Sequence, residues 1–180
     1  MLLVVAATDP ELRGAEGAAT LVSGVGPVDA AAATARWLAE RRPDALLHVG
    51  VAGCRRGCGL APPALVIGSE ARYCDTHSAW VTSTANPDPA LLAAARRALP
   101  GAALLPIGTS AELGGTHGCD VEAMEGFAVL RAAELAGVPA VEVRAVANEI
   151  EEDDRGRWQL DAALAALAES LPGLVAELSR

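Results

Sequence analysis

Four polar side chains stand where the sequence predicts the ends of strands or the start of a helix: Glu11, Glu125, Arg144 and Asn148. Carboxylates, a guanidinium and an amide together suit the water-mediated cleavage of a polar bond, because they can supply a base, a clamp for hydroxyl groups and a contact to the leaving group. A structural interpretation competes with this one: Glu125 would cap its helix and Arg144 would form an ion pair inside the fold. Residue types alone support the catalytic and the structural interpretation equally.

Three of these residues belong to the stretch 120–148, which predicts a helix, a Gly-Val-Pro turn and a buried strand. Acidic residues crowd the expected first turn of this helix, where negative charge suits the helix dipole: Asp120, Glu122 and Glu125. Gly137 should end the helix. In the strand that follows, Glu142 and Arg144 are two residues apart and should therefore share a face.

The rest of the chain alternates apolar strands with helices. Strands are expected at 2–7, 19–23, 45–49, 64–73 and 102–107, and helices at 27–42, 87–99 and 160–178, the last with a kink or break at Pro172. Small residues at Gly50–Gly53, after the strand 45–49, should let a ligand approach the backbone closely. This alternation predicts an α/β fold of three layers, with a mixed, mostly parallel sheet flanked by helices, in a single domain over residues 1–180. Ligands gather at the carboxyl ends of such strands, which is where Glu11 falls.

Composition excludes several classes of function. The net charge of −9 argues against a nucleic-acid-binding surface and gives no support for binding to anionic membranes. All 14 basic residues are arginines, so neither a Schiff-base lysine nor a P-loop lysine is present. The opening run MLLVVAA is too short for a transmembrane helix and lacks the form of a signal peptide, so we expect a buried strand and a cytoplasmic protein.

Familiar catalytic motifs are missing. The sequence contains neither the G-x-S-x-G of serine hydrolases nor the H-E-x-x-H of zinc peptidases, and GVGPVD departs from G-x-G-x-x-G. Cys54 and Cys58 have a spacing that fits structural zinc sites only loosely, so we expect reduced thiols in preference to a metal site. No metal and no organic cofactor is implied.

Five motifs, in order, resemble those of the nucleoside phosphorylase/nucleosidase superfamily: SGVGPVDAAAAT, HVGVAG, GLAPPALVIGSEARY, VEAMEG and VRAVAN. Within it the chain is most similar to the futalosine hydrolases, relatives of the methylthioadenosine/S-adenosylhomocysteine nucleosidases. The resemblance covers most of the chain and implies a purine nucleoside phosphorylase-like fold, a purine nucleoside as the ligand and a homo-oligomer. The implied reaction is hydrolysis of the N-glycosidic bond of futalosine, which yields hypoxanthine and dehypoxanthine futalosine in menaquinone biosynthesis.

The resemblance also implies roles for individual residues. Glu11 would be the general base for the attacking water, and Arg144 would position that water or the carboxylates. Glu125 would hold the ribose hydroxyls, with Met124 against the sugar. Three more residues would lie along the base and ribose: Val51, Ala52 and Gly53.

Asn148 occupies the position at which adenine-specific members of the superfamily carry aspartate. An amide offers one donor group and one acceptor but is no general acid near neutral pH. Its NH₂ group can donate to O6 of hypoxanthine and its carbonyl can accept from N7–H. The residue type therefore favours hypoxanthine over adenine.

Some features depart from the superfamily pattern. Val51 replaces a serine that often stands in the G-x-A-G turn, which favours water over phosphate, whereas TDPELR with Arg13 resembles a phosphorylase phosphate loop. Residues 108–115 lack the aromatic that commonly stacks on the base, and only 11 residues separate Glu11 from Ser23, where the superfamily usually has extra strands. Three alternatives therefore stay open: a methylthioadenosine-type nucleosidase, a purine nucleoside phosphorylase and a non-catalytic nucleoside-binding paralogue.

Overall fold

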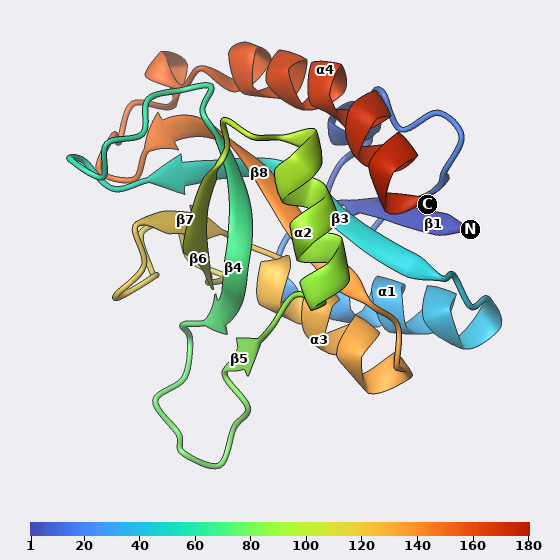
Figure 1. The fold of residues 1–180 in the computed structure, drawn as a ribbon. Helices are drawn as coiled ribbons and strands as arrows, with labels where there is room; N and C mark the ends of the chain where they lie inside the picture. The colour runs from blue at the N-terminus through green and yellow to red at the C-terminus, as the bar shows by residue number, and fades with distance from the viewer.

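A mixed sheet runs through the molecule, with helices on both of its faces (Figure 1). The computed structural model describes residues 1–180. Its strands are β1 (Leu2–Ala6), β2 (Ala19–Val22), β3 (Ala45–Cys54), β4 (Leu65–Tyr73), β5 (Thr84–Ala85), β6 (Ala103–Thr109), β7 (Val121–Ala123) and β8 (Ala140–Glu149). Its helices are α1 (Pro27–Glu40), α2 (Pro89–Ala98), α3 (Gly126–Ala136) and α4 (Leu160–Leu178), with 3₁₀ turns η1 (Asp9–Leu12) and η2 (Arg155–Arg157). The predicted α/β fold, with its mostly parallel sheet between helices, is confirmed.

Most strand pairs are parallel. The strand β1 pairs in parallel with β2 and β3, β3 with β8, and β6 with both β4 and β7. The antiparallel pairs are β3 with β7, β4 with β8 and β4 with β5. Together these pairings link β3, β8, β4, β6 and β7 into a closed strand circuit. The strand β1 pairs with β3 outside this circuit, and β2 pairs with β1.

Two apolar layers hold the helices on the sheet. On one face α2 and α4 cover alternate residues of the central strands, such as Leu47 and Val143 against Leu171 of α4. On the other face α1 and α3 cover the intervening residues, such as Leu3 and Leu46. Successive residues of a strand point to opposite faces, so a continuous apolar run such as LLVVA fills both layers.

The stretch Gly50–Gly53, which corresponds to the G-x-A-G turn of the superfamily motif, is strand. The strand β3 continues to Cys54 and stays paired with β8, with a shift of register between Ala52 and Gly53. Glycine serves close packing here, because a Cβ on Gly50 would lie 2.2 Å from Nη1 of Arg144. The group that comes close to Gly50 is thus a side chain of the fold, and the approach of a ligand to this stretch stays a prediction.

The segment before α3 is also not helical as expected. Residues Val121–Ala123 form β7, and α3 begins only at Gly126. The predicted helix-start charge Glu122 is instead buried in β7, because this short strand joins β3 to β6 and the pairing outweighs the helical preference of glutamate. The helix α3 ends at Gly137 in the left-handed conformation, as predicted.

The helix α4 runs without a break through Pro172. None of the helices combines the length and apolar character that crossing a membrane requires.

Candidate active site

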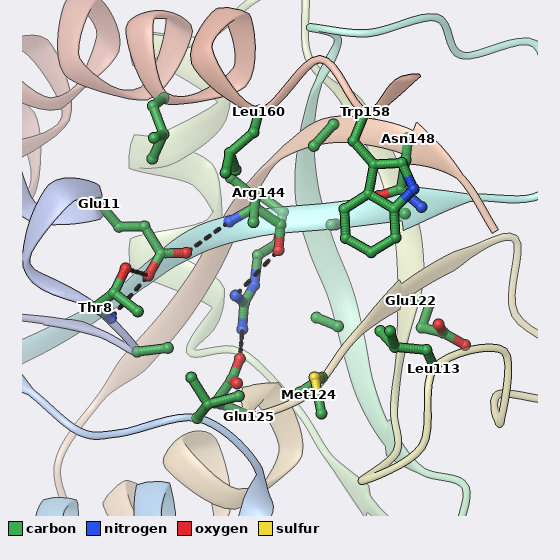
Figure 2. Close-up of a pocket in the computed structure, with 18 of the residues that line it drawn as sticks. Thr8, Glu11, Leu113, Glu122, Met124, Glu125, Arg144, Asn148, Trp158 and Leu160 are labelled. Atoms are coloured by element: carbon green, nitrogen blue, oxygen red, sulfur yellow. Dashed lines mark hydrogen bonds and ion pairs between the residues drawn. The ribbon is translucent and has the colours of Figure 1, made fainter. Parts of the chain in front are cut away.

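A pocket lies at the carboxyl ends of β1, β3 and β8, under the start of α4 (Figure 2). It encloses about 330 Å³, which is in the range of sites for small molecules. All eight predicted site residues line it: Glu11, Val51, Ala52, Gly53, Met124, Glu125, Arg144 and Asn148. The structure thus brings together side chains from distant parts of the sequence, while their roles in binding and catalysis stay predictions.

Glu11 is fixed by three hydrogen bonds. It lies in η1 rather than in the loop expected, and Thr8 precedes this turn as its N-cap. One oxygen, Oε2, accepts from the backbone N–H of Thr8 at 2.8 Å and from its hydroxyl at 2.7 Å, and Oε1 accepts from the N–H of Val51 at 3.0 Å. A carboxylate offers about four acceptor positions, so one remains for a water on the pocket side.

Arg144 projects from β8 between two carboxylates. Its Nε donates to Oε1 of Glu142 at 2.8 Å, and its Nη2 lies 3.4 Å from Oε2 of Glu125. Burial alone would lower the pKa of Arg144, but the charges of Glu142 and then Glu125 outweigh it and leave the pKa raised. The ion pair inside the fold is therefore present, and the same guanidinium also borders the pocket.

Glu125 stands at the N-cap position of α3 without capping it, because its side chain makes no hydrogen bond to that helix. Its Oε1 accepts instead from the backbone N–H of Gly26, 99 residues away, at 3.0 Å. The structural interpretation of Glu125 as a helix cap is wrong. This carboxylate ties the loop before α1 to the pocket.

Asn148 and Trp158 both line the pocket, Asn148 from β8 and Trp158 from the connection between β8 and α4 (Figure 2). The Asn148 Nδ2 donates to the carbonyl of Glu149 at 2.9 Å, which leaves its second N–H and its carbonyl oxygen free. The indole N–H of Trp158 donates to the carbonyl of Glu152 at 3.2 Å, and the guanidinium of Arg155 lies 5.7 Å from the ring. The lining thus includes both an amide and an aromatic ring.

Comparison with protein families assigns the chain to a known superfamily. The model of the Phosphorylase superfamily matches residues 12–179. The chain belongs to the phosphorylase superfamily. A futalosine hydrolase of Streptomyces coelicolor from the curated proteins is 35% identical over 177 residues, which cover 84% of this chain and 75% of that protein.

Solved structures show the same superfamily fold. A methylthioadenosine/S-adenosylhomocysteine nucleosidase of Colwellia psychrerythraea, in complex with adenine, has a TM-score of 0.85 at 20% identity and covers 98% of this chain and 95% of its own. A mutant futalosine hydrolase of Helicobacter pylori has a TM-score of 0.81 at 16% identity, with 98% of each chain covered. At these identities the likeness concerns the fold.

The superfamily motifs did not reveal every side chain of the pocket. Residues that sequence reasoning did not assign to the site also line it: Thr8, Val25, Leu113, Glu122, Trp158, Leu160 and Leu164. Residues 108–115 supply no aromatic side chain to the pocket, and the aromatic ring in its lining is that of Trp158, in the connection between β8 and α4. One sequence feature could have indicated this residue. Trp158 stands just before the helix 160–178 and soon after the strand that ends with the predicted site residue Asn148.

The four cysteines of this superfamily member are free thiols. Burial, together with the neighbouring Cys58, raises the pKa of Cys54 to about 12, so this thiol stays protonated near neutral pH. No group of three or more His, Cys, Asp or Glu side chains is arranged to hold a metal ion.

Gly50→Ala should disable this site. The added Cβ would lie 2.2 Å from Nη1 of Arg144 and 2.9 Å from Oε1 of Glu11, so both side chains must move. Because displacements of about 1 Å cost on the order of 100-fold in rate, we expect kcat/KM for nucleoside cleavage to fall about 100-fold. Gly101→Ala is the matched control, since nothing lies within 4 Å of its Cβ. Equal kcat/KM values for the two variants would contradict the packing argument.

Proposed function

We propose that residues 1–180 act as a single domain that hydrolyses the N-glycosidic bond of a purine nucleoside. The observation that carries this proposal is the clustering of Glu11, Glu125 and Asn148 around one pocket on a phosphorylase-superfamily frame. The 35% identity to a curated futalosine hydrolase supports the same reaction.

In the proposed mechanism Glu11 activates water. The open acceptor position on its Oε1 orients a water molecule, and the carboxylate takes the proton as the water attacks the anomeric carbon. The sugar acquires the character of an oxocarbenium ion as the bond to the base breaks, and the carboxylates of Glu11 and Glu125 stabilise its positive charge. Glu125 also holds the ribose hydroxyls, with Met124 packed against the ring.

The base is hypoxanthine in this proposal. The free N–H of Asn148 donates to O6, and its carbonyl oxygen accepts from N7–H of the departing base. Because an amide is no general acid, the base takes this N7 proton from water. The contact of Nδ2 with the carbonyl of Glu149 holds the amide in this orientation. A 6-amino group at the same place would then set two donors against each other and leave the half-buried amide unpaired. Trp158 supplies the aromatic surface beside the base. The 35% identity to a futalosine hydrolase supports futalosine as the nucleoside, and menaquinone biosynthesis as the pathway of this step.

Water fits the pocket better than phosphate as the attacking group. Arg144 is the basic residue among those that line the pocket, and Glu142 already neutralises it at 2.8 Å. Arg13, which sequence comparison related to a phosphate loop, is exposed and lies outside the pocket lining. A phosphate anion would therefore meet three carboxylates and no unpaired cation.

A homo-oligomer is also proposed. Helices α1 and α3 share an apolar surface hollow that includes Val28 and Leu135, which are 78% and 72% exposed. Covering these side chains with a second copy would remove them from water, and light scattering would measure the resulting mass.

Base release from three nucleosides tests the proposed function. Purified protein is incubated with futalosine, methylthioadenosine and inosine, each with and without inorganic phosphate, and free base is measured by chromatography. We expect release of hypoxanthine from futalosine at a rate that phosphate does not change. Phosphate-dependent release would indicate a phosphorylase, preferential release of adenine a methylthioadenosine-type nucleosidase, and binding without release a non-catalytic paralogue.

A further inference from the structure

Two buried titratable residues lie behind Arg144 and have no part in the mechanism proposed above. His48 on β3 and Glu142 on β8 are register partners in the sheet, and neither side chain is accessible to solvent. The Nη2 of Arg144 lies 3.2 Å from Nδ1 and 3.3 Å from Nε2 of His48. The Nδ1 of His48 lies 3.7 Å from Oε1 of Glu142. Arg144 lines the pocket, and His48 and Glu142 form with it a layer that continues behind the lining.

The charges in this layer follow from burial and mutual distance. Burial, and then the positive charge of Arg144, lower the pKa of His48, so the imidazole stays neutral near neutral pH. Burial alone would raise the pKa of Glu142, but Arg144 and His48 more than offset it and leave the pKa lowered. Glu142 is therefore a carboxylate, and it is the closest negative charge to the guanidinium.

The fold makes specific room for this carboxylate. A Cβ on Gly126, the first residue of α3, would lie 2.3 Å from Oε1 and 2.5 Å from Oε2 of Glu142. The Oε2 atom has no hydrogen-bond partner. A buried charged oxygen without a partner is costly, and an apolar pair would serve the stability of the fold as well or better. The arrangement therefore points to a role beyond stability.

The distances around Arg144 indicate what that role is. Its Nε is 2.8 Å from Glu142, whereas its Nη2 is 3.4 Å from Glu125, and Glu11 forms no ion pair with it within 4.0 Å. Three carboxylates thus surround one guanidinium, and the one outside the pocket holds it most closely (Figure 2 shows the Arg144–Glu125 contact).

We infer that Glu142 is the counter-ion of Arg144, so that Glu125 and Glu11 keep their negative charge for the sugar cation that forms as the glycosidic bond breaks. This inference rests on the proposed nucleosidase function. Glu142 is a positioning residue, since it acts through Arg144 and touches no substrate. Without its charge the guanidinium is drawn to Glu125 and neutralises the group that should face the sugar.

Glu142→Gln tests the inference because it removes the charge and keeps the shape. We expect kcat to fall about 100-fold, as for the loss of one electrostatic contribution to a transition state. We also expect calorimetric affinity for a nucleoside analogue with a protonated pyrrolidine ring to fall about tenfold or more, while affinity for its neutral-ring counterpart stays within about threefold. Glu169→Gln, an exposed glutamate on α4, is the matched control for net charge.

A double-variant comparison separates charge from packing. In an Arg144→Gln background no cation remains to be redirected, so adding Glu142→Gln should change kcat by less than about threefold. Equal effects of Glu142→Gln in both backgrounds, or equal loss of affinity for the charged and neutral analogues, would assign Glu142 a structural role and overturn the inference. Unchanged kcat in a folded Glu142→Gln protein would also overturn it.

Glu142→Asp covers the case in which the glutamine variant does not fold. It keeps the charge with one methylene fewer, so it should retain most of the preference for the cationic analogue; loss of that preference would refute the counter-ion role. The binding measurements also separate this inference from the proposed function. A wild-type protein that releases no base but prefers the cationic analogue would refute hydrolysis and leave the counter-ion role standing.

Discussion

Glu11→Gln removes turnover and leaves nucleoside binding nearly intact. The carboxylate is the proposed base, and general base catalysis contributes about 10²–10⁴ in rate, so we expect kcat to fall by that factor. Glutamine has nearly the same shape, yet its NH₂ group must face either the N–H of Val51 or the N–H and hydroxyl of Thr8, all of which donate to Glu11. The loss of one of these contacts should change the dissociation constant of a bound nucleoside by less than about tenfold.

Single-turnover kinetics and equilibrium binding measure the two effects separately. Glu16→Gln is the matched control, because Glu16 is exposed in the loop that follows η1. A Glu11→Gln protein that keeps full activity would remove Glu11 from the mechanism. Loss of binding in parallel with loss of rate would instead assign Glu11 a structural part in the pocket.

Asn148→Asp should move the preference of the enzyme from 6-oxo toward 6-amino purines. Aspartate can accept from a 6-amino group and, when protonated, can donate to N7, whereas its ionised form has no hydrogen-bond donor for O6. Sites that hydrogen-bond a substrate group discriminate strongly against analogues that lack it, so we expect the ratio of kcat/KM for hypoxanthine over adenine nucleosides to fall at least tenfold, or about 1.4 kcal/mol.

Competition between the two nucleosides in one reaction measures this ratio directly. The chain has one other asparagine, the exposed Asn86, so Asn86→Asp controls for the change of charge. The same ratio in Asn148→Asp and in the wild type would refute the proposed contact between Asn148 and the base.

The sequence predicted those parts of the site that depend on strand ends. Glu11 follows β1, Arg144 stands at the middle of β8 and Asn148 near its end, so a parallel arrangement of these strands was enough to bring their side chains to one pocket. Alternation along β8 likewise placed Glu142 and Arg144 on one face, and they form an ion pair. The alternation of side chains between the two faces of a strand depends only on neighbouring residues, so it can be predicted from the sequence.

The parts that sequence did not predict depend on contacts between distant segments. Glu122 has the helical preference of a glutamate, but pairing of β7 with β3 and β6 makes its segment a strand. Its carboxylate accepts from the N–H groups of Gly114 and Thr116 and from the Thr116 hydroxyl, in a loop whose path has no pattern of its own. Trp158 reaches the pocket only because α4 crosses the sheet, which no local periodicity reveals.

The closed strand circuit has a consequence for how a substrate can enter. Val51, Arg144 and Asn148 belong to β3 and β8, whose backbones are hydrogen-bonded within the circuit, so their positions change little unless the sheet itself opens. Val25, Leu113 and Trp158 line the same pocket from connecting segments outside it. We therefore expect these three segments to move when a ligand enters or leaves, while the residues on β3 and β8 keep their positions.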